Sequence, residues 1–205
     1  THHWQEGYCV AESEKVVRAL LASSLQIRSL LLNADWLKEL EVELRNERFA
    51  DTRVYVAFDQ LLEQIVGFPL HQKLLAIGVL PENPPLERLH NRQAGRAVHV
   101  ALEGIADAEN MGMILRNCAA FGAHSLIVGR DSSSPWLRRS VRVSLGNVFA
   151  LEIHRTDDIL HTLQHCRDAF GWRIIGTTPR GGVPNIDTRR AGDVENICLL
   201  FGSEA

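Results

Sequence analysis

The sequence contains no long run of apolar residues. Of its 205 residues, 45% are hydrophobic, which is enough for a folded core. No apolar segment approaches the ~20 residues that are needed to span a bilayer. The first residues, THHWQEGY, also lack the basic and then apolar pattern of a secretory signal peptide. We therefore expect a soluble, cytoplasmic protein with one or two domains.

Cysteine is scarce, and no two cysteines are close together. The four residues, Cys9, Cys118, Cys166 and Cys198, form no CxxC pair, so neither a disulfide framework nor a zinc site is indicated. The nine histidines show no metal-ligand spacing. We expect the cysteines to be small buried residues, and we expect no metal.

The glycine motifs of several enzyme classes are missing too. There is no GxGxxG after a strand, no GxxxxGK[ST] and no GxSxG, so dinucleotide binding, nucleotide hydrolysis and serine-esterase chemistry lose their usual support. The net charge of −3 excludes a uniformly basic surface, although RNA needs only a local basic patch. The densest basic cluster, Arg138, Arg139 and Arg142, is either a surface that contacts phosphates or a solvated helix face.

A proline-rich stretch, VLPENPPLERLHNRQAGRA, divides the chain. Its prolines lack backbone donors and oppose helix and sheet, so we expect residues 80–96 to be irregular. The predicted domains are 1–85 and 97–205, with a linker over 86–96. In the first, apolar spacing predicts strands in YCVAES, IRSLLLN, TRVYVAF and LLAIGVL, and helices in ESEKVVRALLAS, ADWLKELEVELRN and DQLLEQIVG. This region reads as a small α/β domain.

Strands and helices also alternate after the break. Strands are predicted in AVHVALEGI, HSLIVG, VFALEIH, WRIIGTT and NICLLFG, and helices in AENMGMILRNCAAFG and DDILHTLQHCRDAF. Apolar strands separated by helices predict an α/β domain with a mostly parallel sheet. Such sheets bind ligands beyond the carboxyl ends of their strands. Here those ends carry small and polar residues: Glu103-Gly104, Gly129, Gly176-Thr177-Thr178 and Gly202-Ser203-Glu204.

An arginine stands among small and apolar residues in the helix that follows the first of these strands. Arg116 would be costly there without an anionic partner, such as a phosphate or a carboxylate of a ligand. The alternatives are an ion pair with Asp107, Glu109 or Glu204, or a stem that extends to water. Asn110 near the start of the same helix either faces a ligand or caps the helix.

Taken together, three segments resemble the SpoU family of RNA ribose 2′-O-methyltransferases, within the SPOUT superfamily. They are NMGMILRNCAAFGA, RRSVRVSLGNVFAL and LLFGSEA. The first matches a motif of the form Asn-x-Gly-x-x-x-Arg, through Asn110, Gly112 and Arg116, followed by Phe-Gly. The last matches an apolar strand that ends in Gly-Ser-Glu. EGYCVAESEKVVRALLAS is similar to the family's substrate-binding domain, whose fold is like that of ribosomal protein L30e.

The resemblance implies an α/β fold with an L30e-like domain followed by a SPOUT domain, which forms a trefoil knot in relatives. It implies that S-adenosylmethionine (S-adenosyl-L-methionine) donates a methyl group to a ribose 2′-hydroxyl in rRNA or tRNA, and that the full-length protein is a homodimer. The implied roles are catalysis for Arg116, Asn110 and Glu204, cofactor contact for Gly176, Thr177 and Gly202, and RNA contact for Arg138, Arg139 and Arg142. Arg116 acts either as a base or, as we prefer on pKa grounds, as a charged clamp.

One part of the family pattern is missing from the 205 residues. The third motif, with Ser-Leu-Asn, should follow the second, but the sequence stops at Ala205. We expect the knot to be incomplete in this form and the methyl donor to bind poorly. Two alternatives stay open: an RNA-binding module of the same fold without catalysis, and an unrelated nucleotide-binding α/β enzyme.

Overall fold

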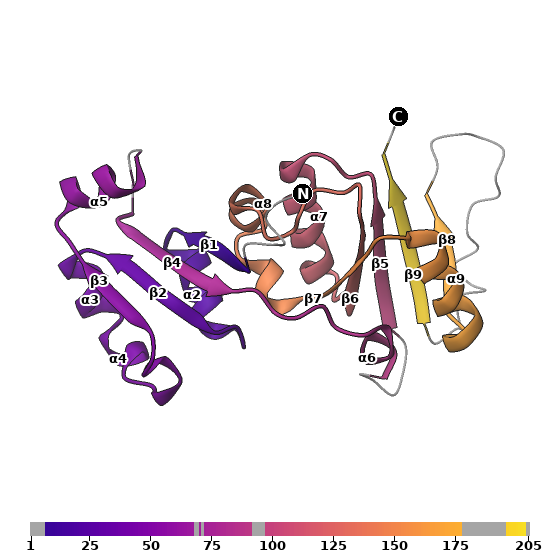
Figure 1. Cartoon of the computed structure of the whole chain (residues 1–205), viewed down its shortest axis with the longest axis horizontal. Helices are drawn as coiled ribbons and strands as arrows, with labels where there is room; N and C mark the ends of the chain where they lie inside the picture. The colour runs from indigo at the N-terminus through magenta and orange to yellow at the C-terminus, as the bar shows by residue number, and fades with distance from the viewer. Residues whose placement is uncertain (1–6, 68–69, 71, 92–96, 178–195, 204–205) are drawn as a thin grey trace. The chain divides into compact units, whose positions relative to one another are not determined.

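The computed structural model describes residues 7–67, 70, 72–91, 97–177 and 196–203. These residues form two β-sheets with their helices (Figure 1). The chain divides into two compact units, which we describe separately. The first contains Thr1–Pro81, Gly112–Arg116 and Ser134–Ala150, and the second contains Glu82–Met111, Asn117–Ser133 and Leu151–Ala205.

The first unit is built on a four-stranded sheet in the order β1-β4-β2-β3. β4 is antiparallel to both β1 and β2, while β2 and β3 are parallel. The strands are β1 (Tyr8–Glu12), β2 (Ile27–Leu32), β3 (Arg53–Val56) and β4 (Leu74–Val79). The helices are α2 (Glu14–Ala22), α3 (Ala34–Glu39), α4 (Glu41–Leu44), the 3₁₀ helix η1 (Glu47–Phe49), α5 (Asp59–Val66), α8 (Arg138–Val143) and the 3₁₀ helix η2 (Asn147–Ala150).

Apolar spacing explains how these helices pack. In α2, Val16, Val17, Leu20 and Leu21 are buried, which is the face that an amphipathic helix turns toward a sheet. Leu62 of α5 packs in a separate cluster with buried leucines at and near β4. α8 contacts β1, and η2 contacts α2, so a segment from much later in the chain completes this unit.

The second unit contains a five-stranded sheet in the order β7-β6-β5-β9-β8. All four strand pairs are parallel, which confirms the mostly parallel sheet expected from the sequence. The strands are β5 (Ala97–Glu103), β6 (Ser125–Gly129), β7 (Glu152–Thr156), β8 (Arg173–Gly176) and β9 (Asn196–Gly202). The helices are α6 (Leu86–Asn91) and α9 (Ile159–Phe170), together with α7 (Ala108–Ala120), whose residues 112–116 fall in the first unit.

A polar group lies inside the core of the second unit. His99 of β5 is fully buried and stacks on Trp172, with ring centroids 3.7 Å apart. Its ring nitrogens lie 2.8 Å from Ser125 Oγ and 3.4 Å from Asn196 Oδ1. Both nitrogens therefore have hydrogen-bonding partners, as a buried imidazole requires.

Three local expectations differ from the structure. The helix predicted in ADWLKELEVELRN is broken at Leu40 into α3 and α4. The strand predicted in VFALEIH begins only at Glu152, because Asn147–Ala150 form η2. Residues 86–91, expected to be irregular, form α6. Pro84 and Pro85 precede this helix, where prolines are tolerated because the first helical amides have no acceptor within the helix.

No described helix is long and apolar enough to cross a membrane. The four cysteines are free and buried, as expected. Burial raises the pKa of the Cys198 thiol to about 12 and that of Cys118 to about 11. These thiols are therefore not nucleophiles at neutral pH.

Candidate active site

The carboxyl ends of the second unit's strands meet at one edge of its sheet (Figure 1). Glu103 of β5 pairs with Gly202 of β9, and Gly176 at the end of β8 pairs with Leu200 of β9. Gly176 and Gly202, both expected to contact a cofactor, are therefore on neighbouring strands, and both are exposed. Their lack of side chains leaves the backbone open to a ligand.

The polar groups of Thr177 are directed back to the sheet. Its amide N and its Oγ1 both donate to the carbonyl oxygen of Leu200, at 3.0 and 3.1 Å. The hydroxyl expected to contact a cofactor is thus already a donor to β9. On the other side of β9, Gly104 has φ +69°, and a Cβ there would lie 3.3 Å from Ser203 Cβ. The loop after β5 therefore runs close to the end of β9.

The start of α7 settles one of the two interpretations of Asn110. Asp107 is the N-cap, and its Oδ1 accepts hydrogen bonds from the amides of Glu109 and Asn110, each at 2.8 Å. The interpretation of Asn110 as the N-cap is therefore wrong. Asn110 lies within the first turn, and its side chain is exposed. An exposed amide at the start of a helix is free to bind a ligand, but the cap itself is supplied by Asp107.

Gly112 allows α7 to approach α8 closely. A Cβ on Gly112 would lie 2.6 Å from Val143 Cβ and 2.9 Å from the carbonyl oxygen of Ser140. Arg116, four residues further along the helix, is exposed. It forms no ion pair with any residue that the structure describes. Its charge is therefore accessible to an anion, and neither Asp107 nor Glu109 neutralises it.

The three arginines of the predicted RNA surface have different environments. Arg138 is bound to Glu12 of β1, whose Oε2 accepts from Nε at 3.0 Å and from Nη2. The side chain of Glu12 is only 16% exposed, so this pair joins α8 to the first sheet. Arg139 and Arg142 are exposed on α8. A phosphate therefore has easier access to Arg139 and Arg142 than to Arg138.

Sequence reasoning noted Glu103 as a strand end but gave it no role. The carboxylate of Glu103 lies against Gly129 at the end of β6, since a Cβ on Gly129 would be 1.7 Å from Glu103 Oε2. Burial raises the pKa of the Glu103 carboxyl, and Asp131 raises it further, while Arg130 lowers it. Only the pairing of the strands brings Glu103 and Gly129 together, so local sequence patterns could not indicate this contact.

Residues 97–205, which contain this edge and α7, match the SpoU rRNA Methylase family. The chain belongs to this family. A tRNA/rRNA methyltransferase of Mycobacterium tuberculosis is 30% identical over 197 residues, which cover 95% of this chain and 66% of the relative. The 23S rRNA (guanosine-2′-O-)-methyltransferase of Acinetobacter baylyi is 29% identical over 120 residues, or 57% of this chain and 48% of that one.

One solved structure aligns with the whole chain. The AdoMet-bound rRNA methyltransferase from Sinorhizobium meliloti aligns over 100% of this chain and 74% of its own, with a TM-score of 0.80 and 23% identity. This likeness confirms the α/β fold expected from the sequence, and the match over residues 97–205 confirms the family. The SpoU chain spans about two thirds of the length of the Mycobacterium relative (66%).

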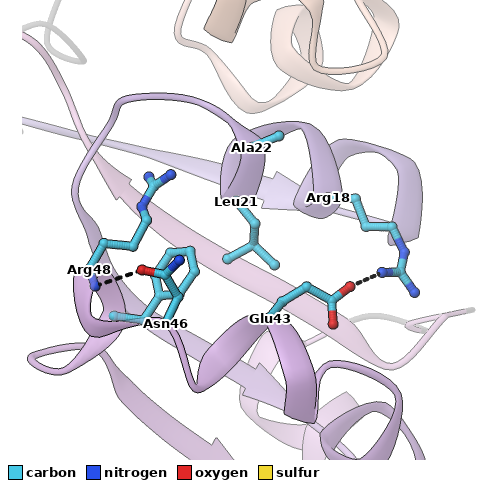
Figure 2. A pocket seen from close by; sticks show the side chains of 7 residues that line it. Arg18, Leu21, Ala22, Glu43, Asn46 and Arg48 are labelled. Carbon is cyan, nitrogen blue, oxygen red and sulfur yellow. Dashed lines mark hydrogen bonds and ion pairs between the residues drawn. The ribbon is translucent and has the colours of Figure 1, made fainter.

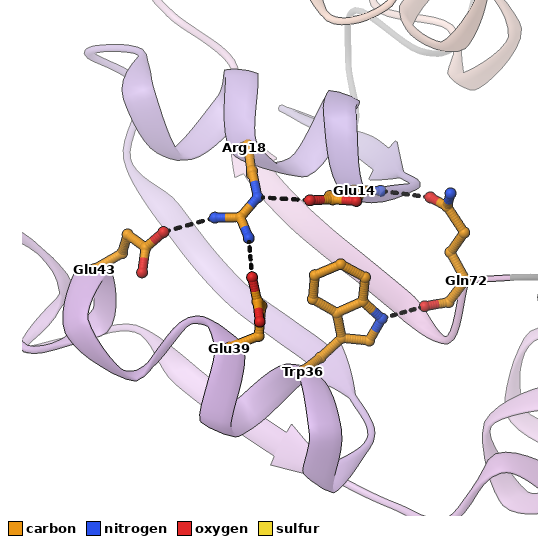
Figure 3. Close-up of polar contacts among 6 residues, drawn as sticks. All are labelled: Glu14, Arg18, Trp36, Glu39, Glu43 and Gln72. Atoms are coloured by element: carbon orange, nitrogen blue, oxygen red, sulfur yellow. Dashed lines mark hydrogen bonds and ion pairs between the residues drawn. The ribbon is translucent and has the colours of Figure 1, made fainter.

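The first unit of the SpoU chain holds a cavity of about 320 Å³ between α2 and the α4–η1 segment (Figure 2). Its most polar lining residue, Arg18, already binds three carboxylates (Figure 3). The Oε1 atoms of Glu14, Glu39 and Glu43 lie 3.0, 2.9 and 2.6 Å from its Nε, Nη2 and Nη1. A phosphate entering here would face these acids, so the cavity is not suited to RNA backbone.

A second, apolar hollow of about 430 Å³ lies on the first sheet beside α5. Tyr55 of β3 is part of its lining and is 51% exposed. Arg53 shares the strand face of Tyr55, because alternate residues of a strand point to the same side, and it is exposed. Unpaired nucleotides stack on accessible aromatic rings, and a cation beside the ring favours their binding.

Two residues singled out from the sequence, Glu204 and Thr178, lie outside the described residues. Glu204 was expected to be catalytic. Among the residues that the structure does describe, no group of three or more His, Cys, Asp or Glu could hold a metal ion.

Proposed function

We propose that the protein carrying this chain transfers a methyl group from S-adenosylmethionine to a ribose 2′-hydroxyl of rRNA or tRNA. The observation that carries the proposal is the family match over residues 97–205, which includes the Asn110, Gly112 and Arg116 motif. The names of the relatives supply the substrate class, since one is a tRNA/rRNA methyltransferase and another a guanosine-2′-O-methyltransferase.

The strand edge of the second unit suits the adenosyl part of the cofactor. Gly176 and Gly202 are exposed, adjacent at this edge and free of side chains. They therefore offer backbone donors and acceptors to a flat base. Thr177 contributes through its carbonyl oxygen rather than its hydroxyl, which is bound to Leu200. When bound, S-adenosylmethionine supplies an electrophilic methyl group on a sulfonium.

Arg116 stabilises charge in this proposal. The 2′-hydroxyl oxygen would form its bond to the methyl carbon as the carbon–sulfur bond breaks and S-adenosylhomocysteine leaves. The hydroxyl proton would pass to solvent or to an RNA phosphate, so negative charge develops on the oxygen as this proton departs. An exposed guanidinium without an ion pair among the described residues can hold an RNA phosphate and face that charge. Arginine keeps its own proton at neutral pH, which favours this role over that of a base. Asn110 orients the ribose or Arg116, and Glu204 serves catalysis by fixing the guanidinium.

The exposed arginines of α8 and the first unit contact the RNA in this proposal. Arg139 and Arg142 bind phosphates, and Arg138 positions α8 through its bond to Glu12. The L30e-like region over 1–85 grips structured RNA, in keeping with the exposed Tyr55 and Arg53 on one strand face.

Assembly and location complete the proposal. The full-length protein is a homodimer that associates through its second domain, in keeping with the exposed Phe121 at the end of α7. It acts in the cytoplasm, where four free buried cysteines are stable as thiols.

Binding and turnover of the full-length protein test the function directly. We expect calorimetry to detect S-adenosylmethionine binding. We also expect radiolabelled methyl transfer to RNA from cells that lack the protein, at a position that mapping of 2′-O-methyl groups identifies. RNA binding without methyl transfer would instead support a non-catalytic RNA-binding module. Donor binding together with methylation of a base would contradict the ribose assignment.

The RNA surface has its own test. Replacing Arg139 and Arg142 with alanine should weaken RNA binding and make it less dependent on salt. Each lost phosphate contact should reduce the slope of log affinity against log salt by about 0.9, the value for a nucleic-acid duplex. Replacing Arg167, an exposed arginine of α9, with alanine is the control for a charge lost away from α8. An unchanged salt slope in the double variant would move the phosphate contacts away from α8.

A further inference from the structure

Glu103 occupies the centre of the strand edge at which the proposed reaction takes place. It is the last residue of β5, which lies between β6 and β9 in the sheet. Its backbone pairs with Gly202, one of the residues proposed to contact the cofactor. The ladder to β6 ends one residue earlier, at Leu102, so the Glu103 backbone is held by its pairing with β9 and by the paired strand before it, which makes its position more rigid than that of a loop residue.

The direction of the Glu103 side chain is fixed by a glycine. Its carboxylate lies across the end of β6, where a Cβ on Gly129 would be 1.7 Å from Oε2 and 2.8 Å from Cδ. Any other residue at position 129 would displace the carboxylate. The lack of a side chain at Gly129 thus leaves space for the Glu103 carboxylate at the edge of the sheet.

Among the residues that the structure describes, none donates a hydrogen bond to the Glu103 carboxylate. Burial disfavours its charged form, and Asp131 adds to this effect. Arg130 opposes it, but Arg130 lies 3.8 Å from Asp131, with which it pairs. A half-buried carboxylate without donors gains most from a ligand that brings a hydroxyl.

We propose that the Glu103 carboxylate accepts a hydrogen bond from a ribose hydroxyl bound at this edge. The assignment rests on the proposed function, in which both reactants contain a ribose: the adenosyl group of the methyl donor and the nucleotide of the RNA. Carboxylates at the ends of parallel strands bind ribose hydroxyls in other α/β folds, which is the same chemistry at the same place in a sheet. Gly202 beside Glu103 leaves room for a sugar ring, since a Cβ there would meet only the carbonyl oxygen of Glu103, at 4.0 Å.

Calorimetry with S-adenosylhomocysteine, in the full-length protein, tests the donor ribose. Glu103→Gln keeps the shape but removes the charge, and Glu103→Ala removes the side chain. Asp131→Asn is the matched control for a lost charge nearby. If Glu103 binds the adenosyl ribose, both Glu103 variants bind about ten- to a hundred-fold more weakly, as expected for a hydrogen bond to a charged group. The control changes less than about threefold.

Deoxy analogues separate a contact from a structural effect. The 2′-deoxy or 3′-deoxy analogue of S-adenosylhomocysteine should bind wild-type protein more weakly but should bind Glu103→Ala as well as the parent compound does. In such a cycle the penalty disappears only when the two groups interact. An equal penalty in wild type and variant, together with a lower unfolding midpoint, would assign Glu103 to structure and overturn the proposal.

The second arm concerns the RNA ribose. If donor affinity is unchanged in Glu103→Gln, but kcat at saturating donor falls ten-fold or more on RNA from cells that lack the protein, the hydroxyl belongs to the RNA. Unchanged affinity and unchanged kcat would overturn the proposal. If wild-type protein neither binds S-adenosylhomocysteine nor methylates RNA, the proposed function itself fails, and this assignment fails with it.

Discussion

At the scale of single residues, the buried His99 links protonation to stability. The pKa of His99 is lowered from 6.5 to about 4, chiefly by burial and to a smaller extent by nearby His124 and His90, although the hydrogen bond to Asn196 opposes the shift. Because the folded-state pKa lies below the unfolded one, folding requires the neutral ring. Its contribution is fully present above pH 6.5 and is lost as the pH falls toward 4. The shift corresponds to about 3 kcal/mol at most.

We therefore expect the free energy of unfolding to fall between pH 6.5 and 5, and His99→Gln to reduce that fall. Glutamine can still reach Ser125 and Asn196 but does not titrate. Urea unfolding at half-unit pH steps measures the slope. His161→Gln, which removes an exposed histidine, should keep the wild-type slope. Equal slopes for wild type and His99→Gln would show that another group governs acid stability.

Arg116 is the residue on which the proposed chemistry depends most. Arg116→Lys keeps the positive charge but loses the planar fork that binds a phosphate through two bonds. We expect methyl transfer to fall by at least a hundred-fold, while the unfolding midpoint stays the same, because the side chain is exposed. Single-turnover assays and thermal unfolding measure the two quantities. Near-normal turnover would assign Arg116 to solubility or folding. Arg167→Lys, at an exposed arginine of α9 without a proposed role, serves as the matched control.

At the scale of elements, the contact between α7 and α8 depends on Gly112. Alanine has the higher helix propensity by about 1 kcal/mol, but its Cβ would lie 2.9 Å from the Ser140 carbonyl oxygen and 2.6 Å from Val143 Cβ. One of these atoms is backbone, so relief requires α8 to move. We expect Gly112→Ala to destabilise the protein by about 1–3 kcal/mol.

Urea midpoints of Gly112→Ala and of Asn117→Ala make the comparison within one helix. Asn117 is exposed, so its replacement should change stability by less than about 0.5 kcal/mol. If helix propensity rather than packing governs position 112, the midpoint of Gly112→Ala will rise instead of falling.

Elements also show what the sequence can and cannot predict. The apolar strands β5, β6 and β9 and the helices α7 and α9 follow from periodicity, and the small residues at the strand ends indicate the edge of the site. The role of Asp107 as cap was missed because Asn110 has the same local preference. The Arg138–Glu12 bond and the packing of Glu103 on Gly129 join distant parts of the chain. Such contacts depend on how the elements pair, which no local pattern contains.

At the scale of the whole molecule, the proposed dimer needs an apolar surface outside the core. Phe121, at the C-terminal end of α7, is 86% exposed, and Met113 on the same helix is 48% exposed. An exposed aromatic side chain offers apolar surface that a partner subunit can cover. In the second unit, Leu160 of α9 is also exposed, at 68%, which provides a comparison of similar size.

We expect Phe121→Ser to weaken self-association of the full-length protein by ten-fold or more while leaving its unfolding midpoint unchanged at a fixed low concentration. The reason is that a buried aromatic ring at the centre of an interface contributes about 2 kcal/mol or more, whereas the same ring in the monomer contributes almost nothing. Sedimentation equilibrium over a range of concentrations measures the dissociation constant. Leu160→Ser should leave that constant unchanged. An equal effect of the two substitutions would place the association on another surface, and a monomeric wild type at all concentrations would contradict the proposed dimer.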